Sequence, residues 1–431
     1  MSFLAPVLHF LRQTRILNKI NDFIERHHVL EFLFLFLLSA FPFFQLLEHS
    51  TFWLLPICLL LFLLSLKSFF GGSKLDFADF LVLLILLLQI STALTGYGRA
   101  MDALTAALLT SVWFPARRFW NEKNEKRFVL FSSLALLIVS AIGVGQYLFG
   151  LAELRWVDAS RFGDIGGRVT SLFSNPNILA VYLLLYFPFS LWAMFLPENK
   201  GRMRVFYAIT SVVGFLCILL TWSRGAWLGL VLQIVLFLLF YSQKTRFLLR
   251  FSPLLLLAVP FLPSNFKSRL LSIGDLGESS IRYRLHTWQG TWRMLLSHPV
   301  GIGIGERAWR AIYPHFALSG TKTVMHAHNV FLQIATELGF VGAVVFLLLV
   351  CICLGKALKK KNTSLFLSLS GTLVMGLFDH LWYYPGMLLP FFAFLAFCVP
   401  CEQKVTAKTS FVDILHEKRC FTVSKNNKMT Y

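Results

Sequence analysis

Three short polar segments interrupt an otherwise apolar chain of 431 residues, at 175–177, 221–225 and 326–329. Each adjoins a long apolar stretch, so each is expected at the end of a helix. Helix N-termini present unpaired N–H groups and a partial positive charge, which favour phosphate-like anions. Arg224, in the second segment, adds paired donors that match phosphate oxygens and stay charged at any relevant pH. Together the segments predict a site for a phosphate-containing substrate.

His326 and His328 allow three interpretations. A His-x-His pair could supply two metal ligands, but zinc needs three or four, and His315 and His380 show no ligand spacing. The second interpretation is a structural histidine whose hydrogen bonds are satisfied. The third is a general base, because an imidazole can take a proton from an acceptor hydroxyl near neutral pH. The residues alone leave these open.

The arginines are also ambiguous. Arg224 lies in a tight turn between two apolar stretches, where a cation is costly unless it binds something. The alternative is an interface residue that extends its charge to water. Arg282 and Arg284 flank opposite edges of an apolar stripe, so periodicity cannot choose between them.

The composition identifies the class of protein. Hydrophobic residues make up 57% and charged residues 14% of the chain, against roughly 45–50% and about 25% in soluble domains. This leaves too little polar surface for a soluble particle, so the chain is predicted to be a polytopic, all-α membrane protein. The aromatic content of 16% excludes a disordered chain.

Apolar stretches of about 20 residues predict twelve transmembrane helices. They fall at 29–47, 51–70, 77–95, 100–116, 128–150, 177–196, 205–222, 225–241, 247–263, 328–354, 363–380 and 382–400. Most of the 40 lysines and arginines then lie on the side of both termini, which predicts cytoplasmic ends. This asymmetry explains the net charge of +19 without nucleic acid. The predicted parts are helices one to nine (1–263), an outer loop (264–327), helices ten to twelve (328–400) and a basic cytoplasmic tail (401–431).

The outer loop has a helical pattern between Ser279 and Ser297. Its apolar residues fall on one face at steps of three and four, at Ile281, Leu285, Trp288, Trp292, Leu295 and Leu296. Trp-rich amphipathic helices of this kind tend to lie in the membrane interface. The alternative is a helix that packs over the bundle.

Residues 326–342, HAHNVFLQIATELGFVG, resemble the signature of the O-antigen ligase and Wzy-type polymerase superfamily. That signature is His-Asn and then, after nine residues, Gly-x-x-Gly, which this chain matches with His328, Asn329, Gly339 and Gly342. Three upstream stretches are also similar to family elements, namely Arg284 to Trp288 followed by HPVGIGIG (298–305), SRGAWLG (223–229) and SNPNILAVYL (174–183). The resemblance covers about 174–342.

The resemblance implies a metal-independent glycosyltransferase of the GT-C type, with twelve helices and a large periplasmic loop, in the bacterial inner membrane. The implied donor is a glycan on undecaprenyl pyrophosphate, and the acceptor is lipid A–core or another glycan. No metal, cofactor or nucleic acid is expected, and the surroundings are membrane lipids. His328 would activate the acceptor hydroxyl, while Arg224 and Arg284 would contact the pyrophosphate. Nearby polar residues expected to bind substrate are Arg282, Asn329, Ser223, Asn177 and His326.

Two other functions remain open at this point. A polymerase of the same superfamily joins repeat units on the lipid carrier and needs the same base and cations. A transporter of bicarbonate or another small anion is the alternative from a different class. Such transporters usually carry ionisable residues near mid-membrane, whereas most acidic residues here fall at the ends of the predicted spans.

Overall fold

The computed structural model describes residues 29–46, 50–69, 75–94, 96–151, 167–241, 245, 247, 250, 264–275, 277, 279–382 and 384–401, and over these residues it is helical without strands. Almost all of the span predicted at 247–263 lies outside this set. So does the tail predicted at 401–431, apart from Cys401.

Seven helical segments of the described residues are long and apolar enough to cross a membrane. They are Val29–Leu46 (α3 Val29–Ala40 with η1 Phe41–Leu46), Phe77–Leu94 (α5 Phe77–Ser91 with η2 Thr92–Leu94), α8 Glu122–Leu148, α10 Pro176–Phe195, α11 Gly201–Leu220, α12 Arg224–Tyr241 and α17 Val330–Lys359. The prediction of an all-helical, polytopic membrane protein is therefore confirmed. A total of twelve spans and an outer loop on the periplasmic side stay predictions.

The other helices of the bundle are α4 Ser50–Phe69, which has 20 residues, and the shorter α6 Ala100–Thr110, α7 Trp113–Phe119, α18 Thr363–Gly376, η5 Pro385–Met387 and α19 Leu388–Phe397. The stretch predicted as one span at 100–116 is thus two helices with a turn between them. The spans predicted at 363–380 and 382–400 are shorter than expected, because α18 ends at Gly376 and α19 begins only at Leu388. The stretch between them carries Asp379 and His380.

Helix α10 forms the centre of one half of the bundle. Nearly all of its side chains are buried, and it contacts α8, α11, α12 and α18. Gln233 of α12 donates hydrogen bonds to the carbonyls of Leu184 in α10 (2.7 Å) and Leu367 in α18 (3.2 Å). Such bonds hold helices together where water is absent. The N-terminal ends of α10 and α12, which carry two of the polar segments, are thereby fixed.

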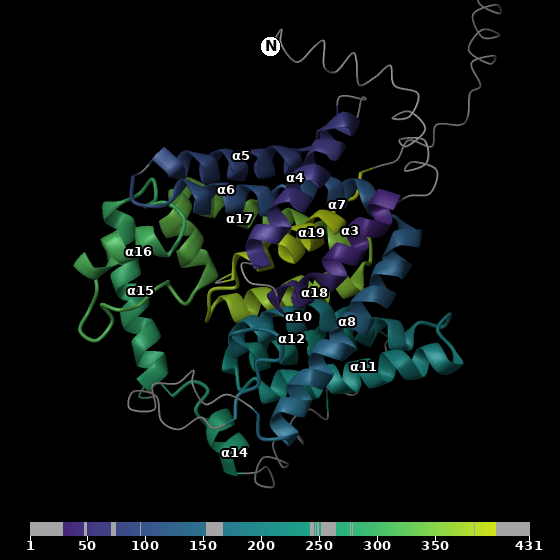
Figure 1. Ribbon diagram of the computed structural model, residues 1–431. Helices are drawn as coiled ribbons and strands as arrows, with labels where there is room; N and C mark the ends of the chain where they lie inside the picture. The colour runs from purple at the N-terminus through teal and green to yellow at the C-terminus, as the bar shows by residue number, and fades with distance from the viewer. Residues whose placement is uncertain are drawn as a thin grey trace, which may run out of the picture. The chain divides into compact units, whose positions relative to one another are not determined.

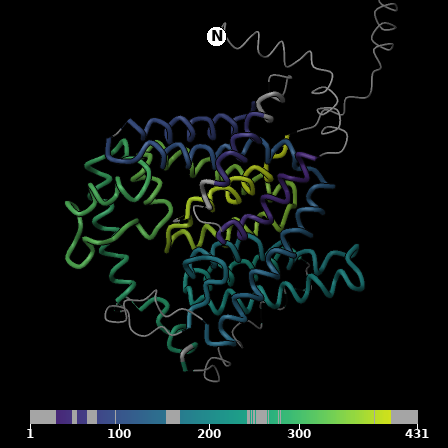
Figure 2. The backbone as a smooth tube through the Cα atoms, viewed as in Figure 1, coloured from purple at the N-terminus to yellow at the C-terminus, as the bar shows by residue number. Residues whose placement is uncertain are grey.

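The segment between α12 and α17 contains α14 (Ser264–Leu271), α15 (Ser279–Ser297), α16 (Glu306–Ile312) and η4 (Tyr313–His315). In Figure 1, α15 and α16 lie together at the left, beside the ends of α6 and α17, and Figure 2 shows the same arrangement of the backbone. The helix predicted between Ser279 and Ser297 is confirmed with those bounds.

The apolar stripe of α15 is only partly buried, with Leu295 against the protein and Ile281 and Trp288 half-buried. The residues buried against the protein are Thr287, Gly290, Thr291, Met294 and Leu295, and the two threonine hydroxyls donate to carbonyls four residues earlier. Three members of the stripe stay exposed by 41–59%, namely Leu285, Trp292 and Leu296. Of the two interpretations of the stripe, this exposure favours contact with the membrane interface.

Helix α17 is broken at Gly339, inside the predicted span. Gly339 has φ 75° and ψ −179°, which are not helical. The loop that follows α15 fills the break: Ile302 N–H donates to Thr336 O (2.7 Å), and Phe340 N–H donates to Pro299 O (3.0 Å). Irregular backbone at membrane depth is tolerated only when its polar groups are satisfied in this way.

The glycines at this junction are required by the close approach of two backbones. A Cβ at Gly339 would lie 2.6 Å from Pro299 O, and a Cβ at Gly301 would lie 2.5 Å from Glu337 O. Both glycines also have positive φ angles, which other residues rarely adopt. The glycine motifs therefore attach the α15–α16 segment to α17.

Candidate functional site

Asn329 fixes the start of α17 and so the position of His328. Its Oδ1 accepts hydrogen bonds from Phe331 N (2.9 Å) and Leu332 N (3.0 Å), as expected of an N-cap residue. Its Nδ2 donates to Leu377 O at the end of α18 (2.9 Å). His328 precedes the cap with φ 48°, in the left-handed region. A non-glycine residue is held there only by its surroundings, which is common at functional sites.

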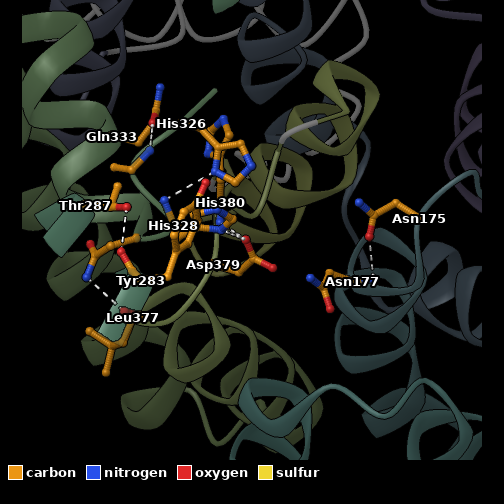
Figure 3. A network of polar contacts seen from close by, with 12 residues as sticks. Asn175, Asn177, Tyr283, Thr287, His326, His328, Gln333, Leu377, Asp379 and His380 are labelled. Carbon is orange, nitrogen blue, oxygen red and sulfur yellow. Dashed lines mark hydrogen bonds and ion pairs between the residues drawn. The ribbon is translucent and has the colours of Figure 1, made fainter. Parts of the chain in front are cut away.

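His328 pairs with a carboxylate that sequence reasoning did not single out. Its Nδ1 lies 3.2 Å from Oδ1 of Asp379, in the turn after α18 (Figure 3). The same oxygen accepts the His380 N–H (2.8 Å). Burial raises the pKa of Asp379, but the His328 hydrogen bond and the nearby His326 and Arg284 outweigh it. The pKa lies below its usual range, so Asp379 is ionised at neutral pH.

Two further imidazoles lie beside His328. The ring centroid of His326 is 4.1 Å from that of His328 and 5.5 Å from that of His380. Burial is the main cause that lowers the pKa of His326 well below its usual range and that of His380 to about 3. Both rings are therefore neutral at pH 7. The Nδ1 of His326 accepts the backbone N–H of His328 (3.3 Å), which helps to fix the turn.

Arg224 is the first residue of α12 and is buried, in the tight turn that the sequence predicted. Its guanidinium donates to the carbonyl and hydroxyl oxygens of Ser272 (3.0 Å each) and to the hydroxyl of Ser280. Arg224 therefore connects α12 to the segment between α14 and α15. Ser223, the residue before it, is also buried.

Arg168, which sequence reasoning missed, lies with Arg269 at the turn that holds Arg224, because Arg168 donates to Thr221 O (2.9 Å) and Arg269 donates to Trp222 O (3.3 Å). Burial and the charges of Arg269, Arg284 and Arg224 lower the pKa of Arg168 to about 9, while Asp379 acts in the opposite direction. We call Arg168, Arg224, Arg269 and Arg284 the arginine cluster. Three cations at one turn, with the charge of Arg284 acting on Arg168, make a positive site, which suits a diphosphate.

Asn177 holds one member of this cluster. Its Oδ1 accepts a hydrogen bond from Arg168 (2.7 Å), and its backbone N–H donates to the Asn175 side chain (2.8 Å) at the start of α10. Figure 3 shows both asparagines on a helix end separate from the histidines. The structure thus gives Asn177 a role in positioning Arg168.

The structure distinguishes Arg282 from Arg284, which the periodicity of the sequence could not do. Arg284 is half-buried and contributes to the electrostatics of Asp379, His326 and Arg168. Arg282 is exposed, and its guanidinium donates to the Gly277 carbonyl (3.2 Å). Of the predicted site residues, the structure brings His328, Asn329, His326, Arg284 and Arg224 into one region and leaves Arg282 facing outward.

Metal binding is chemically feasible at one point. One ligand atom each of His326, His328 and Asp379 lie within 4.8 Å of one another, and this is the one such group of three among the described residues. Three nitrogen and oxygen ligands with an open position are typical of catalytic zinc. Here, however, the facing atoms of His328 and Asp379 already share a hydrogen bond. The absence of a metal therefore stays a prediction.

Chelation should leave activity unchanged. Purified protein dialysed against 1,10-phenanthroline should keep its transfer rate, because the His328–Asp379 hydrogen bond occupies the atoms that would bind the ion. A metal-dependent site would instead lose activity as the chelator removes the ion. If activity is lost and added zinc restores it, the prediction is wrong. If activity is lost and added zinc does not restore it, the chelator has damaged the protein by another route.

These features define a class: a polytopic helical membrane protein whose site pairs a histidine and a carboxylate with a cluster of arginines. Residues 209–347 match the Wzy_C family model, described as O-antigen ligase. The resemblance to the O-antigen ligase and Wzy-type polymerase superfamily is thereby confirmed for that part of the chain, which holds Arg224, Arg284 and His328. None of the curated proteins compared with the chain matches it.

Proposed function

We propose that the protein transfers a glycan from an undecaprenyl-diphosphate carrier to a hydroxyl of lipid A–core, as an O-antigen ligase does. The observation that carries this proposal is the His328–Asp379 pair (3.2 Å) next to the arginine cluster. Displacing a diphosphate from an anomeric carbon needs a base for the attacking hydroxyl and cations for the leaving group. Both are present here, and the family match supports the same reaction class.

Asp379 determines which nitrogen of His328 is the base. A carboxylate can only accept hydrogen bonds, so the contact places a proton on Nδ1 of His328. Nε2 is then the basic nitrogen, and it takes the proton of the acceptor hydroxyl as that oxygen bonds to the anomeric carbon. The bond from this carbon to the diphosphate oxygen breaks, and undecaprenyl diphosphate leaves. Direct attack inverts the anomeric configuration.

The arginine cluster acts on the leaving group. Negative charge on the bridging oxygen grows as its bond to the sugar breaks, and preformed cations stabilise that charge without reorganisation. Arg224 begins α12 and is held by Ser272 and Ser280, so its position is set before substrate binds. The charge of Arg284 acts on both Asp379 and Arg168, so it contributes to the base pair and to the other cations.

The site should face the periplasm, across the bacterial inner membrane from the basic ends. Topology reporters fused after Asn121 and after Asn362 should report cytoplasm, and a reporter after Ser319 should report periplasm. The reason is the excess of lysine and arginine on the side of the termini. A cytoplasmic signal at Ser319 would place the site where no exported acceptor is present, and the proposal would fail.

Surface-glycan electrophoresis of a deletion strain tests the reaction. Loss of long chains from lipopolysaccharide with accumulation of lipid-linked polymer supports a ligase. Collapse of the ladder to a single repeat unit would assign the same chemistry to a polymerase. An unchanged glycan profile would contradict glycosyl transfer and favour a transporter.

A further inference from the structure

A cavity of about 650 Å³ adjoins the histidines on the side of α6 and α16. Its walls come from α6, from the Gly305–Arg310 stretch, from α17 and from the turn after α18. His326 and His380 line it, and the ring centroid of His326 lies 4.1 Å from that of His328. The cavity is therefore separated from the proposed base by the His326 side chain, and its volume is in the usual range for small-molecule sites.

The charges in this cavity differ from those of the arginine cluster. Three arginines (Arg99, Arg307 and Arg310) and three carboxylates (Asp102, Glu306 and Glu337) line it, so the two signs are equal in number. Arg310 and Glu306 form an ion pair. No member of the arginine cluster is among the lining residues. A diphosphate should therefore prefer the cluster, and the cavity should take a ligand of lower charge.

The chemistry of the lining suits a ligand rich in hydroxyl groups. Each sugar hydroxyl can donate a hydrogen bond to a carboxylate and accept one from a guanidinium, so a wall with both groups can use both the donor and the acceptor of the hydroxyl. Gln333 adds an amide, and Trp382 adds an aromatic surface. A site that hydrogen-bonds the hydroxyls of its ligand rejects analogues that lack them, which makes a hydrogen-bonding wall selective for polyhydroxylated ligands.

We infer that this cavity binds the sugar of the acceptor and presents its hydroxyl past His326 to His328. The inference rests on the proposed transfer reaction and adds a separate route for the second substrate. The donor diphosphate occupies the arginine cluster, and the acceptor sugar enters from the α6–α16 side. The proposed base lies between the two.

Two substitutions test the cavity by different means. Arg307→Ala removes an exposed guanidinium of the wall, and Thr105→Trp fills space from α6. The matched control is Arg293→Ala, an equally exposed arginine of α15 that does not line the cavity. The probes are lipid-free core oligosaccharide and a lipid-free single repeat unit, and binding of each is measured by calorimetry with purified protein. Transfer is measured separately, with donor and acceptor each varied.

The wild type and Arg293→Ala should bind one of the two oligosaccharides with the same affinity. Arg307→Ala and Thr105→Trp should weaken that binding and raise the acceptor KM about tenfold, while the donor KM stays unchanged. Equal affinity in all four proteins, or no binding of either oligosaccharide, would overturn the inference. If the melting temperature falls in Thr105→Trp but not in Arg307→Ala, the result for Arg307→Ala decides. Failure of the wild type to transfer glycan at all would instead overturn the proposed function, because the binding measurement does not depend on turnover.

Discussion

Replacing His328 with alanine should abolish glycan transfer while leaving donor binding nearly intact. The variant removes the group that takes the proton from the acceptor hydroxyl, and a positioned general base contributes roughly 10²–10⁴-fold to a rate. The donor should still bind, because the arginine cluster lies on other elements: the loop before α10, and α12, α14 and α15. The measurement is transfer by purified variants with a lipid-linked donor, alongside a separate donor-binding titration.

Asp379→Asn is the informative companion variant. The amide oxygen can still accept from the His380 N–H and from Nδ1 of His328, but it lacks the negative charge that stabilises the imidazolium formed when His328 takes the hydroxyl proton. The expected result is therefore a large part of the His328→Ala loss, with the fold retained. His326→Ala should be milder, because His326 lies outside the His328–Asn329 pair of the family motif, and its Nδ1 accepts the backbone N–H of His328. Substantial turnover in His328→Ala would exclude the general-base role, and lost donor binding in that variant would assign His328 to the diphosphate site.

Local features of this site could be predicted from the sequence. His328 and Asn329 are adjacent, and the asparagine caps the helix that the apolar stretch predicts. The bounds of α15 follow from periodicity alone. Its buried face does not, because in a membrane protein an apolar stripe can meet lipid and a threonine face can meet protein. In α15, Leu285, Trp292 and Leu296 are exposed, whereas Thr287 and Thr291 are buried against the protein.

Contacts across the chain could not be predicted in the same way. Asp379 lies 51 positions from His328, and spacing along a sequence carries no information on which helix ends meet. One signal was present: Asp379 and His380 are titratable residues within a stretch predicted as membrane-spanning, which is a default indication of function. The break at Gly339 was hidden because the apolar stretch continues through it, although Gly339 and the glycines of 298–305 had already been noted as family motifs.

Replacing Arg224 with lysine should weaken donor binding strongly, and replacing Arg284 with lysine should do the same. Lysine keeps the charge, but its compact ammonium cannot reproduce the planar, two-pronged contact of a guanidinium with phosphate oxygens. Truncating a buried, hydrogen-bonded charge costs about 2–5 kcal/mol, so the alanine variants should lose roughly 30-fold or more in donor affinity. Arg282→Lys and Arg282→Ala are matched controls on the same helix as Arg284 and should bind donor normally, because Arg282 is exposed and contacts only the Gly277 carbonyl among its described hydrogen bonds.

Ser280→Ala distinguishes binding from support. Arg224 donates to the Ser280 hydroxyl, so a purely structural role for Arg224 would make Ser280→Ala reproduce much of the defect of Arg224→Lys. If Arg224 instead binds the diphosphate, Ser280→Ala leaves the guanidinium in place through Ser272 (3.0 Å) and donor affinity should change little. The titration uses undecaprenyl diphosphate without glycan, so that the measured affinity reports only on the binding of the diphosphate and its lipid. Equal affinity of the wild type and of the Arg224→Lys, Arg284→Lys and Arg282→Lys variants would show that the arginine cluster does not hold the leaving group, and the diphosphate would have to be placed elsewhere.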